Sequence, residues 1–359
     1  MLVFMGKEYS KNEIIDILKR NIELEKIVVN LSIENQSYKL KELKEESSIY
    51  FHEYLSFWLE HHKQNIEETT YDGYKLVLEK HIIPYFVDKK IMLKNLKTID
   101  IQNYYDYKLS CGLSANTIIR HHANIHRALD YACKIDLIDT NVSDKVDLPK
   151  KQKYRSCFYT VDELNQILDI AKNSPAYTPI YLTGLLGLRR SEVLGLKWNN
   201  IDFNNNTVKI NRKVVKYPTS NKIVIKDKLK TELSYRTLPL PDALISHLYV
   251  LKQQRAKNSN ISNIEYEFIC LNKNNTLYKP DALSKAFKKI VKESNLHYIR
   301  FHDLRHSCAS MLHSLGYDLK TIQEWLGHSD IGTTGNVYVH LQDKNKEKVA
   351  ADINMALKK

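Results

Sequence analysis

The chain has 359 residues, a formal net charge of +12 and a hydrophobic share of 43%. This length predicts two or three domains with packed cores, and the basic excess favours a polyanionic partner such as nucleic acid, although general surface basicity gives the same number. No apolar run approaches a membrane span, and residues 1–5 are too short for a signal-peptide core, so we expect a soluble cytoplasmic protein.

The first third of the sequence predicts helices. Residues 1–47 place the capping-box pair Ser10 and Glu13 ahead of apolar residues at helical spacing, which indicates a helical accessory segment. This segment fits an accessory DNA-binding element, an oligomerisation helix or a plain appendage. Residues 48–148 predict a helical unit, whose second helix ends at Pro84 and whose fourth is capped by Ser114.

Basic side chains gather on that fourth helix, in the predicted linker 149–159 and at one later position. Such a set is often just a solvated face, but it also suits contacts to DNA phosphates. A basic linker would lie along the DNA backbone and add salt-dependent affinity. The predicted DNA-binding residues are Arg120, His121, Arg127, Lys150, Lys151, Lys153 and Arg190.

A second domain is predicted for residues 160–342. Thr160 and Glu163 form a capping box, and residues 176–196 are apolar and helical. Residues 198–203, 207–215 and 235–240 alternate as strands, with turns at 204–206 and 218–221. Helices return after Pro241. The predicted fold class is therefore mainly α with a small antiparallel β-sheet.

Four separated segments of this second domain contain polar residues that suit phosphate chemistry. In the first, Arg189 lies in an apolar stretch and Glu192 follows three residues later, on the same face of the predicted helix. A structural ion pair is one explanation, because a buried unpaired charge is costly. The other is a carboxylate that holds a guanidinium fork ready for a phosphate.

The other three segments follow in chain order. Lys228 and Lys230 lie at a turn that enters a strand, where a lysine is usually only solvated. His302 and Arg305 are three residues apart, so a helix would place both beside one oxyanion. The last segment contains Leu-Gly-His at 326–328 and then Tyr338, although a tyrosine is a core residue in most proteins.

Arginine, lysine, His-x-x-Arg, Leu-Gly-His and a tyrosine, in this order, resemble the tyrosine recombinase (phage integrase) family. The resemblance covers residues 160–342 closely, and residues 48–148 are similar to the family's helical, SAM-like core-binding domain. The extra N-terminal segment and the Thr-Thr-x-x-x-Tyr-x-His ending look most like integrases of phages and conjugative transposons of low-GC Gram-positive bacteria.

The resemblance implies a site-specific recombinase with these catalytic residues: Arg189, Lys230, His302, Arg305, His328 and Tyr338, with Glu192 in support. Tyr338 would attack a DNA phosphate and form a 3′-phosphotyrosine, while arginines stabilise the non-bridging oxygens. Histidines would donate hydrogen bonds or assist proton transfer. Lys230 would protonate the leaving 5′-hydroxyl, with Lys226 and Lys228 as rivals.

The resemblance also implies partners and assembly. Because the phosphotyrosine conserves the bond energy, resealing needs no ATP, metal or other cofactor. The expected partners are double-stranded DNA recombination sites, further copies in a synaptic tetramer and a directionality factor. Residues 343–359 carry an apolar helical stripe, which would pack on a neighbouring subunit or on the chain's own domain. Gly335 and Asn336 are poor helix formers, so the Tyr338 segment is expected to be mobile before assembly.

Other functions remain open at this level. A chromosome- or plasmid-dimer resolving recombinase shares the chemistry. A type IB topoisomerase uses a similar catalytic set but relaxes supercoils without a sequence requirement. A non-catalytic DNA-binding regulator is disfavoured, because all seven expected positions are filled. A metal-dependent nuclease is disfavoured too, because no paired carboxylates or histidine cluster show suitable spacing.

Overall fold

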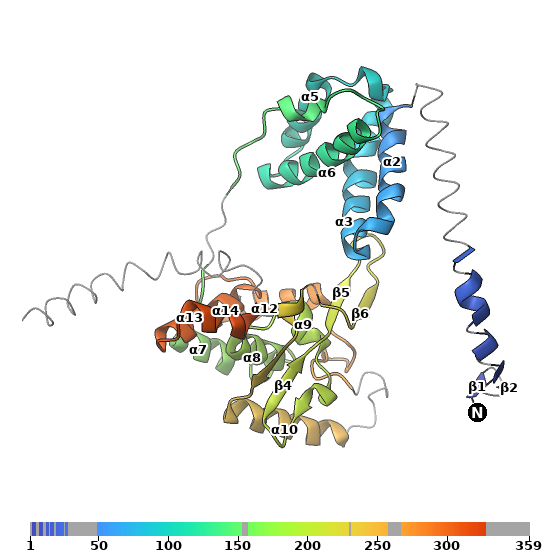
Figure 1. Ribbon diagram of the computed structural model, residues 1–359. Coiled ribbons are helices and arrows are strands. Elements are labelled where there is room, and N and C mark those ends of the chain that lie inside the picture. The colour runs from blue at the N-terminus through green and yellow to red at the C-terminus, as the bar shows by residue number, and fades with distance from the viewer. Residues whose placement is uncertain are drawn as a thin grey trace, which may run out of the picture. The chain divides into compact units, whose positions relative to one another are not determined.

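The computed structural model describes residues 49–152, 157–229, 231–257 and 267–327, together with parts of residues 2–27. The chain divides into two compact units, Met1–Lys153 and Tyr154–Lys359 (Figure 1). Helices dominate both, and the sheets are small and antiparallel, which confirms the predicted fold class. Among the described residues, no helix has the length and apolar character needed to cross a membrane.

The N-terminal segment begins with a hairpin. Strand β1 (Leu2–Phe4) pairs antiparallel with β2 (Lys7–Tyr9). The described residues between positions 12 and 27 are helical, in agreement with the prediction for that stretch. The hairpin was not predicted, because three-residue strands are too short for an alternating pattern to be recognised.

The helices of the first unit enclose an aromatic core. Its helices are α2 (Phe51–His62), α3 (Glu68–Val77), α4 (Ile83–Lys89), α5 (Thr98–Ser110) and α6 (Ala115–Lys134), with 3-10 turns η1 (Lys63–Asn65), η3 (Leu93–Asn95) and η4 (Val142–Lys145). Ser114 caps α6 as predicted, since its side chain accepts a hydrogen bond from the backbone N–H of Thr117. Tyr54 is fully buried, and its hydroxyl donates to the Ala128 carbonyl, which joins α2 to α6.

The second predicted helix does not end at Pro84. From α3 the chain continues through a π-helical turn, η2 (Leu78–Ile82), directly into α4. At this junction the N–H of Ile83 donates to the Leu78 carbonyl, five residues back. Pro84 lies in the first turn of α4, where a missing N–H is tolerated. The chain therefore stays helical to Lys89, and the predicted end at Pro84 was wrong.

The second unit packs helices around two small sheets. Its helices are α7 (Val161–Ala171), α8 (Tyr177–Leu186), α9 (Arg190–Gly195), α10 (Asp242–Ala256), α12 (Pro280–Glu293), α13 (Asp303–Ser314) and α14 (Leu319–Leu326), with 3-10 turns η5 (Trp198–Asn200) and η6 (Glu232–Ser234). Thr160 and Glu163 form the predicted capping box of α7. A single apolar core links α7, α8 and α12 to the sheet.

The predicted strands form two sheets. One has the order β3-β4-β7, built from β3 (Ile201–Asp202), β4 (Thr207–Ile210) and β7 (Arg236–Pro239), with Val208 opposite Leu238. The other is the hairpin of β5 (Lys213–Lys216) and β6 (Ile223–Lys226). The predicted strand 207–215 is therefore two strands that belong to different sheets. The turns at 204–206 and 218–221 were predicted correctly.

The apolar stretch 176–196 forms two helices instead of the one predicted. Helix α8 ends at Leu186 because Gly187 adopts a left-handed conformation, with φ of 63°. The left-handed φ favours glycine, and a Cβ atom here would lie 2.1 Å from Cδ2 of Leu326 on α14, so a larger residue would also have to displace that leucine. Helix α9 then starts with Arg189 as its N-cap, in extended backbone conformation. This break determines where the arginine points.

Candidate active site

Arg189 and Glu192 form the predicted pair, but through a helix cap and not across a helix face. The backbone N–H of Arg189 donates to Oε2 of Glu192 at 3.0 Å, while its Nη1 donates to Oε1 at 2.6 Å. Its Nη2 donates to the Gly327 carbonyl at 2.7 Å. The side chain of Arg189 is still 31% exposed, whereas that of Glu192 is 2% exposed.

Glu192 is the centre of a cluster of three arginines. Besides Arg189, its carboxylate accepts a hydrogen bond from Nη2 of Arg236 at 3.1 Å. Burial alone would raise the pKa of this carboxyl, but the guanidinium groups of Arg236, Arg189 and Arg305 together hold the pKa below its usual range. Glu192 is therefore a buried anion, and it compensates the positive charge that the arginines bring into the core.

Arg305 enters the same cluster from helix α13. It is 1% exposed, and its Nη1 donates to the carbonyl of Gly187 at 2.6 Å. Gly187 is the residue at which α8 ends. Burial and the nearby charge of Arg189 lower its pKa to about 9, which leaves the guanidinium charged at neutral pH. The two arginines that the sequence singled out thus lie close enough to interact electrostatically.

His302 is the N-cap residue of α13, three positions before Arg305. The residue keeps an exposed surface. Even so, the protein packed around its ring, and then the neighbouring His306 and Arg305, lower the pKa of His302 well below its usual value. Asp303, which is fully buried, ties this helix start to Arg300 through hydrogen bonds of 2.9 and 3.1 Å.

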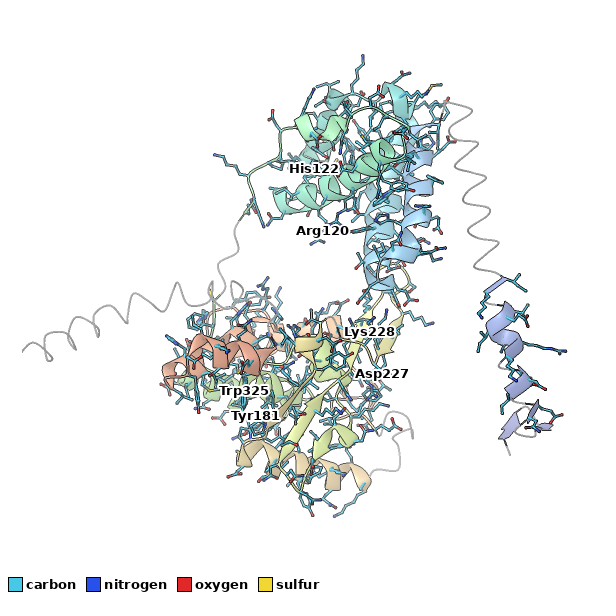
Figure 2. The ribbon with its side chains drawn as sticks, in the orientation of Figure 1. Arg120, His122, Tyr181, Asp227, Lys228 and Trp325 are labelled. Atoms are coloured by element: carbon cyan, nitrogen blue, oxygen red, sulfur yellow. The ribbon has the colours of Figure 1, made fainter. Side chains whose placement is uncertain are left out.

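Three predicted catalytic residues, Lys230, His328 and Tyr338, lie outside the described residues. Of the rival lysines, Lys226 is the last residue of β6 and Lys228 is exposed in the loop that follows (Figure 2). Asp227 forms an ion pair with Arg212 at this point. The structure thus brings Arg189, Glu192, His302 and Arg305 together.

Two family models match the sequence. Residues 158–345 match the model described as phage integrase family, and residues 50–109 match the one described as phage integrase, N-terminal SAM-like domain. The chain belongs to the phage integrase family. Its members are tyrosine recombinases, enzymes that cut and rejoin DNA, so the family inferred from the motifs is confirmed.

Related integrases cover most of the chain. The ICEBs1 integrase of Bacillus subtilis strain 168 is 26% identical over 326 residues, which are 88% of this chain and 86% of the relative. A protein named tyrosine recombinase XerC-like, from Caldanaerobacter subterraneus subsp. tengcongensis, is 28% identical over 282 residues, or 72% of this chain and 71% of the relative.

Solved integrase structures share the fold. The Tn1549 transposon integrase in complex with transposon right end DNA matches with a TM-score of 0.69 and 20% identity, over 84% of this chain and 100% of that chain. A lambda integrase tetramer bound to a Holliday junction matches with a TM-score of 0.59 and 18% identity, over 90% of both chains. At these identities, the likeness concerns the fold.

Most predicted DNA-binding residues of this integrase-family chain lie at its surface. Arg120 is exposed on α6 (Figure 2). Arg127 is exposed on the same helix, and Lys150 and Lys151 are exposed after it, whereas Lys153 lies outside the described residues. Arg127 lies over the ring of Tyr74, with 5.6 Å between the guanidinium carbon and the ring centroid.

Arg190 pairs with helix α12 and not with the arginine cluster. Its Nη1 donates to the hydroxyl of Ser284 at 2.7 Å and lies 4.0 Å from Asp281, both on α12. The side chain of Arg190 is 40% exposed. It therefore joins α9 to α12 and keeps a surface that solvent reaches.

His121 was predicted to contact DNA, and the structure contradicts this. The residue is 1% exposed, and its Nδ1 lies 2.8 Å from the Tyr104 hydroxyl. Burial, and then the nearby His81 and Lys108, lower its pKa to about 4, so the ring is neutral. His121 is a core residue. Arg120 and His121 are neighbours on α6, and the side chain of Arg120 is exposed to solvent while that of His121 is buried.

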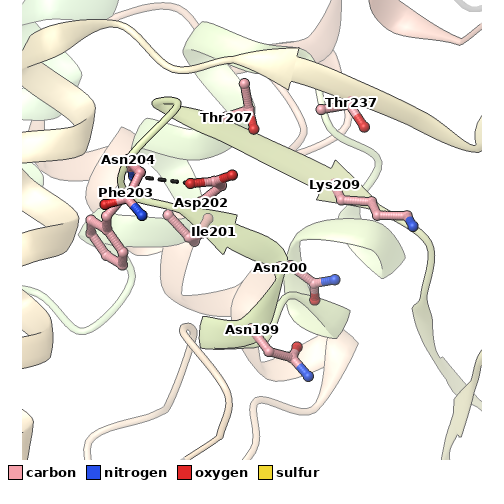
Figure 3. Close-up of a pocket in the computed structure, with 9 residues that line it drawn as sticks. All are labelled: Asn199, Asn200, Ile201, Asp202, Phe203, Asn204, Thr207, Lys209 and Thr237. Atoms are coloured by element: carbon pink, nitrogen blue, oxygen red, sulfur yellow. Dashed lines mark hydrogen bonds between the residues drawn. The ribbon is translucent and has the colours of Figure 1, made fainter.

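Two further features of the described residues lie apart from the arginine cluster. Figure 3 shows a pocket on the β3-β4-β7 sheet, and no predicted catalytic residue lines it. One group, His126, Asp130 and Asp144, has the spacing of a metal site. Its histidine nitrogens already pair with the two carboxylates, at 3.0 and 2.8 Å, which ties α6 to η4.

Proposed function

We propose that this integrase-family chain is a site-specific recombinase that cleaves and rejoins DNA through a 3′-phosphotyrosyl bond at Tyr338. The observation that supports it is the arrangement of Arg189 and Arg305. They come from segments more than a hundred residues apart, yet Arg305 bonds the Gly187 carbonyl, two residues before Arg189. Both guanidinium groups interact with the buried Glu192 carboxylate, Arg189 through hydrogen bonds and Arg305 electrostatically. Such a pair suits the two non-bridging oxygens of one phosphate.

Arg189 is the arginine that reaches the phosphate most directly. Its N-cap position and its bonds to Glu192 and Gly327 fix the guanidinium, while 31% exposure leaves an edge that a DNA strand can approach. A guanidinium carries five N–H donors, so a bidentate contact to phosphate is compatible with these bonds. Because the fork is held before DNA arrives, little reorganisation accompanies the transition state.

The proton transfers fall to His302, His328 and Lys230. A lowered pKa keeps the His302 imidazole neutral near pH 7, so it can accept a proton or donate an N–H bond. The tyrosine loses its proton as it attacks the phosphorus, aided by the nearby guanidinium charges. Lys230 donates a proton to the leaving 5′-oxygen, and the reverse reaction with a new 5′-hydroxyl reseals the strand without ATP or metal.

The domains share the grip on DNA in this proposal. Residues 48–148 form the core-binding domain, residues 149–159 a basic linker and residues 160–342 the catalytic domain, followed by a C-terminal tail at 343–359. Arg120, Arg127, Lys150, Lys151, Lys153 and Arg190 contact backbone phosphates. The active form is a tetramer on two double-stranded recombination sites, with a directionality factor that selects excision. The rate of DNA cleavage is then expected to rise with formation of the tetramer.

Integration and excision of a mobile element is the role we infer. It is supported by the extent of similarity, because the ICEBs1 integrase aligns with 88% of the chain and the XerC-like recombinase with 72%. Resolution of chromosome or plasmid dimers is the second candidate, since the XerC-like relative has the higher identity, 28% against 26%. Recombination between two unlike sites, tested against two identical sites, separates the roles.

A covalent trapping experiment tests the proposed chemistry. The purified chain is mixed with nicked DNA from the ends of the element that encodes it, and an SDS-stable adduct is expected, also in the presence of EDTA. Tyr338→Phe is expected to bind this DNA with unchanged affinity and to form no adduct. Absence of an adduct from the wild type, or an adduct from Tyr338→Phe, would refute the proposal.

A further inference from the structure

Arg236 is the third arginine of the cluster around Glu192, beside the two proposed to bind phosphate. It is the first residue of β7, and its side chain is 7% exposed. Each of its three guanidinium nitrogens donates a hydrogen bond to a different segment. The acceptors are the Trp325 carbonyl at 3.0 Å, the Ser234 carbonyl at 3.1 Å and Oε2 of Glu192 at 3.1 Å.

Each of these acceptors is bonded to a proposed catalytic residue or lies within a few residues of one in the sequence. The carboxylate of Glu192 also holds Arg189. The Ser234 carbonyl belongs to the last residue of the short turn η6, in the loop that follows Lys230. The Trp325 carbonyl lies in the last turn of α14, immediately before the Leu-Gly-His motif. One planar guanidinium therefore connects the neighbourhoods of an arginine, a lysine and a histidine that are far apart in the sequence.

The packing around Gly327 brings Arg236 still closer to this motif. Gly327 ends α14 with φ of 68°, and a Cβ atom there would lie 2.8 Å from the Leu233 carbonyl oxygen and 3.1 Å from Nη1 of Arg236. The Gly327 carbonyl itself accepts the bond from Arg189. The η6 loop, Arg236 and the end of α14 are thus in direct contact, with no space for a side chain between them.

We propose that Arg236 is a positioning residue for DNA cleavage: it holds the Glu192–Arg189 pair, the loop after Lys230 and the end of α14 in one register. This inference rests on the proposed function. Lysine cannot replace Arg236 in this role, because an ammonium group lacks the planar fork that reaches three acceptors in different directions. Misplacement of a reacting group by about 1 Å can slow a reaction roughly hundredfold.

The test compares Arg236→Lys with a matched control, Arg255→Lys. Arg255 also donates a hydrogen bond to a backbone carbonyl, that of Phe268 at 2.7 Å, but it lies on α10, which contributes none of the proposed catalytic residues. For both variants we would measure melting temperature, affinity for a nicked half-site and single-turnover cleavage. A second substrate carries a 5′-bridging phosphorothiolate, whose thiolate leaving group needs no proton donor.

Arg236→Lys is expected to cleave the ordinary substrate roughly ten- to a hundredfold more slowly than Arg255→Lys, with similar DNA affinity. The phosphorothiolate is expected to restore a large part of this loss, because the misplaced lysine is then no longer required. Equal rates for the two variants would overturn the inference. A rate loss of the same size on both substrates would overturn the part that concerns the loop after Lys230, because a misplaced Arg189 slows both substrates equally.

Two further controls keep the outcome decisive. Arg236→Gln is measured alongside, and if neither variant at position 236 folds, the residue serves the fold alone and the inference is overturned. If the wild type and Arg255→Lys form no covalent adduct at all, the proposed function has failed instead. Normal adducts from both, together with an undiminished rate in Arg236→Lys, refute the positioning role while the proposed function stands.

Discussion

Replacing Glu192 with glutamine tests whether one buried carboxylate holds the arginine cluster together. The side chain is 2% exposed and accepts three hydrogen bonds: from the backbone N–H and Nη1 of Arg189, and from Nη2 of Arg236. Glutamine keeps the shape but has one acceptor oxygen and no charge. Removing one partner from a buried ion pair typically destabilises a protein by about 3–5 kcal/mol.

For a domain near 200 residues, a loss of about 4 kcal/mol lowers the melting temperature by roughly 8–16 °C. The control is Glu163→Gln, which alters the same capping-box position of α7, where Oε2 accepts from the Thr160 N–H at 2.8 Å. That side chain is 28% exposed and pairs with His297 at 3.4 Å, not with an arginine, among the described residues, so a loss of only about 1 kcal/mol is expected.

The pH dependence gives a second check. Since the arginines hold the pKa of Glu192 below its usual 4.5, its contribution to stability is complete above that value and is lost as the pH falls through the lowered pKa. The difference in melting temperature between the wild type and Glu192→Gln should therefore be large at pH 7 and small in stronger acid. The reasoning would be refuted if Glu192→Gln had the same melting temperature as Glu163→Gln and cleaved DNA at the wild-type rate.

Three further predictions concern neighbouring parts of the chain. Gly327→Ala should destabilise the protein by about 1–3 kcal/mol and slow cleavage, because its Cβ would meet the Leu233 carbonyl at 2.8 Å; an unchanged melting temperature contradicts this. The His302 ring should be neutral at pH 6 by NMR, because burial and neighbouring cations lower its pKa; a titration near 6.5 would show the opposite. Arg127→Gln should weaken DNA binding equally for all sequences and reduce the salt slope by about 0.9, with no effect on cleavage at saturating DNA; an unchanged slope excludes a phosphate contact.

Local sequence patterns were sufficient for several features of the fold. The caps at Ser114 and Thr160 were predicted correctly, because a cap depends on residues within three positions of it. The prediction failed at Pro84, because a π-helical turn before the proline lets the helix continue through it. It also failed at His121, whose ring is buried beside Tyr104 from another helix. At His121 the deciding partner lies on another helix, outside the local pattern, whereas at Pro84 it is the unusual turn directly before the proline.

The sequence by itself determined the family, because the order of arginine, lysine, His-x-x-Arg, Leu-Gly-His and tyrosine is readable without coordinates. Only the tertiary structure decided how Arg189 is held. It shows that the predicted helix breaks at Gly187, where Leu326 approaches from α14, and that Arg236 joins Glu192 to the end of α14. These contacts join residues that are roughly 40 to 140 positions apart, and no local periodicity encodes their packing.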